Sequence, residues 1–124
     1  MTAGSIDGLA GVLIWTEAHR FPAMARFYRD TLGLAARTAK GDFVNFDWDG
    51  VRLSVGVHER VYGLSRHPLR IMINLAVTDI QVVHERLVRA GVVFTRAPEQ
   101  EDWRGWVATF ADPDGNILQL LQLP

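Results

Sequence analysis

Residues 112–116, Asp-Pro-Asp-Gly-Asn, constrain the fold more than any other stretch of the chain. Proline fixes its own φ, and glycine and asparagine tolerate a positive φ, so the five residues predict a tight reversal. The leucine-rich residues that follow, 117–123, predict a strand whose side chains alternate between two faces. Gln119 shares a face of that strand with Ile117 and Leu121, so an amide is placed among apolar side chains.

The first half of the chain predicts a strand, a helix and three further strands. Residues 9–15 form an apolar, branched run that is typical of a buried strand. Apolar residues recur from Phe21 to Leu32 at helical spacing, with Pro22 suited to the first turn and Gly33 to the C-terminal cap. Short strands are expected at 34–38, 43–48 and 51–57, and residues 58–69 form a surface connection.

The second half repeats this order. A strand is expected at 71–77, followed by a helix that Thr78 or Asp79 caps and that ends at Gly91. Further strands are expected at 92–95, 106–111 and 117–123, with a polar loop at 96–104. The sequences of the two halves can be matched by position, because Leu32-Gly33 corresponds to Ala90-Gly91 and Asp49-Gly50 corresponds to Asp114-Gly115. We therefore expect one α+β domain, residues 1–124, with β-α-β-β-β modules at about 9–58 and 70–123.

Composition excludes several classes of protein. The chain has 124 residues and a formal net charge of −1, with the two signs interspersed, so a nucleic-acid partner is not expected. It has no cysteine, which excludes disulfides and thiolate chemistry. No run approaches a membrane span and residues 1–8 carry no export signal, so we expect no membrane partner and a cytoplasmic location.

The predicted strands each have an apolar face and a mixed face. The apolar faces suit packing against a helix. The mixed faces combine small, polar and large apolar side chains, which favours a ligand cavity over a second dry core. The candidate cavity residues are Leu13, Trp15, Arg52, Ser54, His58, Met72, Asn74 and Gln119.

The chain resembles the vicinal oxygen chelate superfamily, which groups glyoxalase I, bleomycin-resistance proteins and extradiol dioxygenases. The resemblance rests on four segments, residues 26–34, 77–80, 87–92 and 110–116, and it covers nearly the whole chain from Leu9 onward. It implies two modules that form a curved sheet around a cavity, with the helices on the outer face. It also implies a homodimer with two equivalent cavities, because short two-module chains of this superfamily commonly pair.

The resemblance also implies where a divalent metal would bind. The metal-dependent members take ligands from the first and last strand of each half, which match Leu13, Ser54, Met72 and Gln119 here. Leucine and methionine offer no hard donor and serine is a weak one, so the usual metal site is not expected. We expect no cofactor and a small, apolar or aromatic ligand, as in bleomycin-resistance-like sequestering proteins.

An enzymatic alternative stays open. A metal-dependent lyase, isomerase or dioxygenase would need a displaced divalent metal site, for which Glu17, His58 and Gln119 are the candidates. His58 has a second interpretation as a strand-end histidine with local hydrogen bonds, and Gln119 as an amide that bridges water. His19, His67 and His84 are interpreted as surface residues. Trp48, Trp103 and Trp106 are candidates to line the pocket, and Trp48 and Trp106 have a second interpretation as ordinary core or edge aromatics.

Overall fold

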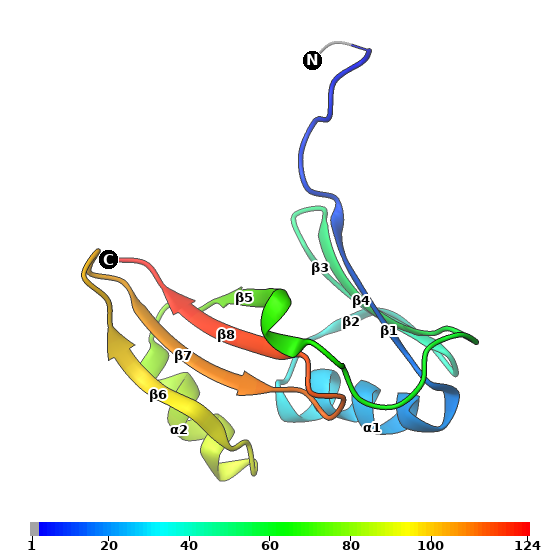
Figure 1. Ribbon diagram of the computed structural model, residues 1–124. Helices are drawn as coiled ribbons and strands as arrows, with labels where there is room; N and C mark the ends of the chain where they lie inside the picture. The colour runs from blue at the N-terminus through cyan, green and yellow to red at the C-terminus, as the bar shows by residue number, and fades with distance from the viewer. Residues whose placement is uncertain (1–2) are drawn as a thin grey trace.

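The computed structural model describes residues 3–124, which form two four-stranded sheets and two α-helices (Figure 1). The first half contains β1 (Gly11–Thr16), α1 (Phe21–Arg26), β2 (Ala36–Lys40), β3 (Phe43–Trp48) and β4 (Val51–Val57). The second half contains β5 (Met72–Ala76), α2 (Ile80–Arg89), β6 (Phe94–Gln100), β7 (Trp106–Ala111) and β8 (Ile117–Gln122). Both halves follow the predicted β-α-β-β-β order. Within this described part, no helix is both long and apolar enough to cross a lipid bilayer.

The two sheets have the same topology. Sheet A has the strand order β1-β4-β3-β2 and sheet B the order β5-β8-β7-β6. In each sheet the first strand of the module pairs in parallel with the last, and the other neighbours are antiparallel. In the described part of the chain, β1 and β5 are therefore edge strands, each paired on one side.

Each sheet has a helix face, which packs toward the α-helices, and an open face on its other side. Leu53 and Val55 of β4 are buried on the helix face of sheet A, and Phe110 and Leu118 are buried on the helix face of sheet B. The helices contribute Met24, Tyr28, Ile80 and Leu87 to the same continuous core. The apolar faces that the alternation predicted are thus the faces that pack in the core, and the mixed faces are the open ones.

The first helix ends in a wider turn than the sequence predicted. After α1 the chain forms a π-helical turn over Phe27–Thr31, in which the N–H of Leu32 donates to the carbonyl of Phe27 at 2.8 Å. Gly33 then adopts φ of +75°, so glycine ends the helix as expected. The apolar residues predicted at helical spacing still lie on one buried face despite the wider π-helical turn, because Tyr28 and Leu32 are both buried in the core.

The prediction of a polar loop at 96–104 was wrong for its first half. Strand β6 continues to Gln100 and includes Pro98, because β6 is an edge strand where a missing N–H breaks no ladder. Its pairing with β7 shifts register twice, between Phe94 and Glu99. The other outer strand, β2, also shifts register against β3, between Ala36 and Thr38. Both outer edges are therefore irregular, whereas the ladders of β1 and β5 show no shift.

The 112–116 turn does more than reverse the chain, because its two carboxylates bind the first module. The turn belongs to the second module but lies beside α1 of the first module (Figure 1). The hydroxyl of Tyr28 donates to Asp112 Oδ2 at 2.7 Å. Asp114 accepts hydrogen bonds from Thr16 Oγ1 at 2.5 Å and from Arg20 Nε at 2.6 Å. We call these five residues, Thr16, Arg20, Tyr28, Asp112 and Asp114, the carboxylate latch.

Tyr28 and Asp112 of the latch are buried, and burial changes the titration of these two groups. Burial raises the pKa of the Tyr28 hydroxyl well above its ordinary value, and the neighbouring charge of Asp112 raises it further. Burial also raises the pKa of Asp112, although hydrogen bonds from Tyr28 and Asn116 oppose that rise. The backbone N–H groups of Asp114 and Asn116 both donate to Asp112 Oδ1, at 2.9 and 3.0 Å, so the turn supplies most of the donors that this carboxylate needs.

We predict that Tyr28→Phe lowers the free energy of unfolding by about 1.5–3 kcal/mol at pH 7, because a hydrogen bond to a buried carboxylate is lost. The folded-state pKa of Tyr28 lies above its unfolded value. Its contribution to stability is therefore fully present below about pH 10 and is lost as the pH rises through the folded-state pKa. Urea unfolding at pH 9 and pH 11 should show a smaller alkaline loss in Tyr28→Phe than in the parent protein.

The exposed Tyr62 provides the matched control. Tyr62→Phe leaves Tyr28 as the one tyrosine of the chain, and absorbance of tyrosinate at alkaline pH should then appear together with unfolding. Ionisation of Tyr28 in the folded Tyr62→Phe protein near pH 10 would contradict the latch as described.

Candidate ligand-binding faces

The open face of sheet A carries five of the candidate residues. Cross-strand register places Leu13 beside Ser54 and Ser54 beside Asn45, which form one row across three strands. Asn45 and Ser54 are buried under their neighbours, and Asn45 Oδ1 accepts the backbone N–H of Thr38 at 3.0 Å. This row supplies a hydroxyl and an amide at the centre of the face.

The next row is aromatic and lies over a glycine. Trp15, Gly56 and Phe43 are adjacent by register, and a Cβ built on Gly56 would lie 3.0 Å from the Trp15 ring and 3.1 Å from the Phe43 ring. The ring of His58 meets the Trp15 ring edge-on, with 5.2 Å between centroids. Trp15 is nevertheless 41% exposed. Because glycine at position 56 has no side chain, the two rings approach its backbone closely and form an apolar surface, which we call the aromatic platform (Trp15, Phe43, Gly56 and His58).

The open face of sheet B is more polar. Asn74 of β5 lies beside Gln119 of β8, and Gln119 lies beside Thr109 of β7. Met72 pairs with Ile117 on the same face and is 39% exposed. The amide of Gln119, which stood out among leucines in the sequence, therefore belongs to a row of two amides and a hydroxyl.

Register corrects one correspondence between the halves. The sequence analysis matched Met72 to Leu13, the first-strand metal position. In the structure Leu13 pairs with Ser54 and Asn74 pairs with Gln119, so Asn74 is the counterpart of Leu13. The match was displaced by two residues, because the alternation along one strand does not show which residue of β5 lies opposite Gln119. The four positions then carry a leucine, a serine and two amides.

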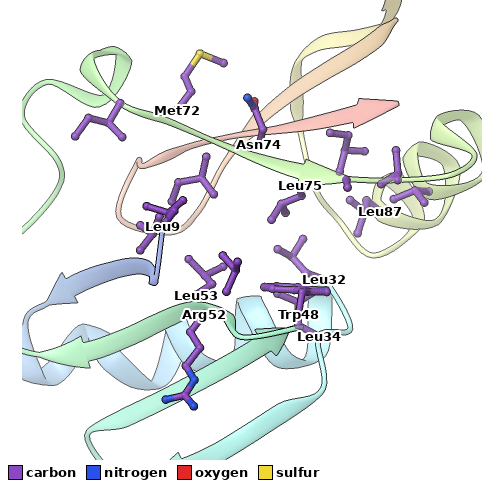
Figure 2. A pocket seen from close by; sticks show the side chains of 18 of the residues that line it. Leu9, Leu32, Leu34, Trp48, Arg52, Leu53, Met72, Asn74, Leu75 and Leu87 are labelled. Atoms are coloured by element: carbon purple, nitrogen blue, oxygen red, sulfur yellow. The ribbon is translucent and has the colours of Figure 1, made fainter. Parts of the chain in front are cut away.

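The two open faces point in opposite directions within one chain. Figure 2 shows Met72 and Asn74 extending to one side of the space between the sheets and Arg52 extending to the other. Leu53 and Leu75, from the helix faces, point into the space between. The candidate residues therefore form two groups, Leu13, Trp15, Arg52, Ser54 and His58 on sheet A and Met72, Asn74 and Gln119 on sheet B.

The residues considered for a displaced metal site have other partners. The carboxylate of Glu17 accepts the backbone N–H of Gly63 at 2.9 Å and lies 3.2 Å from His19 Nδ1. His58 Nδ1 accepts the backbone N–H of Arg60 at 3.0 Å. Gln119 lies on the other sheet. Within residues 3–124, no three histidine, aspartate or glutamate side chains are grouped so that they could hold a metal ion.

The remaining aromatic candidates are dispersed. Trp48 lies between the modules, Trp106 packs against the core, and Trp103 is half exposed and covers Gly105. His84, which was expected at the surface, is partly buried and meets the Phe94 ring edge-on at 4.5 Å. The four tryptophans therefore do not line one pocket.

Sequence reasoning missed Phe43, Asn45 and Thr109 on the open faces. Each lies on a strand whose bounds were predicted correctly. Alternation along β3 would have placed Phe43 and Asn45 on one face, but which face is open depends on cross-strand register. The turn residues Asp49 and Gly50 fix that register, since they set Trp48 opposite Val51.

Solved structures share this architecture. A glyoxalase-related enzyme from Fulvimarina pelagi is 21% identical, with a TM-score of 0.75 over 96% of this chain and 90% of that one. A glyoxalase/bleomycin resistance protein/dioxygenase superfamily member from Sphaerobacter thermophilus is 24% identical, with a TM-score of 0.69 over 94% and 98%. One from Nocardioides is 20% identical, with a TM-score of 0.71 over 96% and 85%. A search of curated proteins found no match.

These structures and the paired β-α-β-β-β modules define the class as the glyoxalase/bleomycin-resistance/dioxygenase fold. The model of the glyoxalase-like domain matches residues 14–121. The chain belongs to that family, and thereby to the vicinal oxygen chelate superfamily that its sequence resembles.

We predict that Gly56→Ala displaces the rings of the aromatic platform, because the new methyl group occupies the space against Trp15 and Phe43. Overpacking of this kind costs about 1–3 kcal/mol in unfolding free energy. Chemical denaturation measures that loss, and tryptophan fluorescence reports the movement of Trp15.

Gly41→Ala is the matched control, because a Cβ at Gly41 meets nothing within 4 Å. Its unfolding free energy should stay within about 0.5 kcal/mol of the parent value. Equal effects of the two substitutions would contradict the close packing over Gly56.

Proposed function

We propose that this protein is a metal-free, small-molecule-binding member of its family, which holds an apolar or aromatic ligand against the aromatic platform. The observation that carries the proposal is the exposed ring of Trp15, which packs close to Gly56 with Phe43 and His58 as neighbours. A platform of this kind offers an apolar surface to a planar ligand. Ser54 and Asn45 in the adjacent row place polar groups beneath this face, next to the platform.

The metal-free part of the proposal follows from donor chemistry. The four positions that match the family's metal ligands, as the register assigns them, are Leu13, Ser54, Asn74 and Gln119. Neutral amides and a hydroxyl are weak ligands for a divalent transition metal, and leucine is none. The side chains at these four positions therefore do not fit a divalent metal ion.

A ligand enclosed from both sides needs two sheet faces that lie opposite each other. We propose that a second copy of the chain provides one of these two faces. In such a homodimer the open face of sheet A of one copy lies opposite the open face of sheet B of the other. Leu13, Trp15 and Met72 are each 39–47% exposed, which is costly for large apolar side chains and favours their coverage. The single-sided pairing of β1 and β5 leaves backbone groups that a partner can also satisfy.

We predict that protein purified without chelator carries no stoichiometric manganese, iron, nickel or zinc, as measured by elemental analysis. A neutral planar probe, 1-naphthol, should bind in equilibrium dialysis and change tryptophan fluorescence. Trp15→Leu should weaken that binding about tenfold or more, because base-like stacking on an aromatic side chain contributes roughly 1–3 kcal/mol. One tightly held metal per chain, lost with an activity on chelation, would instead favour the metal-dependent enzyme.

We also predict a dimer at micromolar concentration by analytical ultracentrifugation. Leu13→Glu places a charge on the open face of sheet A and should give monomers that no longer bind 1-naphthol tightly. Val82→Glu is the control, because Val82 is also exposed but lies on α2. A parent protein that is monomeric and binds the probe with full affinity would contradict the shared cavity.

A further inference from the structure

A concave region lies between the modules, on the helix-face side of both sheets. It is a groove of about 640 Å³, within the 300–1,000 Å³ that is usual for small-molecule sites. Figure 2 shows the apolar side chains that point into it from both modules. We call it the inter-module groove, and it is lined by Leu32, Leu34, Trp48, Leu53, Leu75 and Leu87.

The groove belongs to the helix faces and not to the candidate ligand-binding faces. Leu53 points into it while its neighbour Ser54 belongs to the open face. Leu75 also points into the groove, whereas the side chain of Asn74, which borders the groove, extends away from it (Figure 2). A ligand in the groove would therefore lie behind the sheets, with a strand between it and the aromatic platform. The inference that follows does not rest on the proposed function.

Large apolar side chains at the rim of the groove are exposed to solvent. Trp48 is 48% exposed and Ile71, on the other module, is 72% exposed. Trp48 is held at the rim by the hairpin turn after β3, in which Asp49 and Gly50 both have positive φ. Apolar surface fixed in this way around a cavity gains most from a hydrocarbon ligand that removes it from water.

The charge at the groove comes from arginine. Arg86 of α2 lines the groove, and its guanidinium donates to the carbonyl oxygens of Thr31 and Leu32 at 3.3 and 3.0 Å. No carboxylate within residues 3–124 pairs with Arg86. Arg52, the other arginine of the lining, extends away from the groove and pairs with Asp47 at 3.3 Å (Figure 2). The groove thus has an apolar interior and one uncompensated cation at its exposed margin.

We propose that the inter-module groove binds an amphipathic anion, a medium-chain fatty acid or a similar carboxylate with a hydrocarbon tail. The tail lies along the leucines of the two modules and covers Trp48. The head group remains at the margin, where Arg86 offers its remaining N–H donors and an uncompensated positive charge. The apolar interior of the groove and the charge at its margin together favour an amphipathic anion. A neutral hydrocarbon leaves the charge of Arg86 without a counter-charge, and Arg86 repels a cation.

The test uses sodium decanoate below its micelle concentration, with decyltrimethylammonium as the ligand of equal chain length and opposite charge. Calorimetry should show that decanoate binds and that the cation binds at least fivefold more weakly. The fluorescence change caused by decanoate should persist in Trp15→Phe and disappear in Trp48→Phe, which separates the groove from the aromatic platform.

Two variants and one matched control test which residue supplies the charge and whether the ligand occupies the groove. Arg86→Met should weaken decanoate binding about fivefold, the factor that one partly exposed ion pair contributes. Arg89→Met, a matched change three residues further along α2 and outside the lining, should leave it unchanged. Leu34→Trp fills the groove and should abolish binding of decanoate, and thermal unfolding verifies that each variant is folded.

The proposal is overturned if decanoate and its cationic counterpart bind equally or if Arg86→Met and Arg89→Met behave alike. It is also overturned if decanoate does not bind. In that case, shielding of Trp48 from acrylamide in a dimer would assign the groove to a second copy of the chain.

Discussion

The arrangement of the two modules depends on two buried carboxylates in one turn. Asp112 and Asp114 are separated by a proline, and both accept hydrogen bonds from the first module. The turn itself supplies further donors to Asp112, from Asp114 and Asn116. A buried carboxylate without donors is very costly, so the turn is stable in this place only when Thr16, Arg20 and Tyr28 surround it. The carboxylate latch therefore couples the folding of the second module to the position of the first helix.

That coupling decides which faces of the sheets meet. Because the latch joins the 112–116 turn to β1 and to the turns on either side of α1, the helix faces of both sheets turn toward one core and the open faces turn outward. The aromatic platform and the amide row of Asn74 and Gln119 are consequently presented on separate sides of one chain. The same arrangement leaves the inter-module groove between the helix faces of the two sheets.

Much of this architecture could be predicted from local signals. Alternation in residues 51–57 identified the face that packs in the core, and glycines 33 and 91 marked the helix ends because both adopt positive φ. The continuation of β6 through Pro98 could not be predicted, because a proline reads as a loop unless the strand is known to be an edge. The local signal for a helix likewise contains nothing that specifies the π-helical turn after α1.

The candidate site was less predictable than the fold, for a reason that concerns distance along the chain. Alternation showed that Trp15, Ser54 and Gln119 belong to mixed faces, but it did not show that these faces point apart. That outcome depends on Tyr28 and Asp112, which are 84 residues apart and whose contact no local pattern announces. Asp112 was interpreted as a turn-forming residue. That interpretation is correct, but it omits the hydrogen bond that Asp112 accepts from Tyr28.

The irregular outer strands restrict how copies of this chain can associate. β2 and β6 carry register shifts, and β6 also carries Pro98, so neither offers a continuous row of backbone groups to another sheet. The regular ladders belong to β1 and β5, the inner strands of the two sheets. The unpaired edges of β1 and β5 are the regular ones, so the homodimer proposed above would use these two edges. A growing fibre has no regular outer edge from which to propagate.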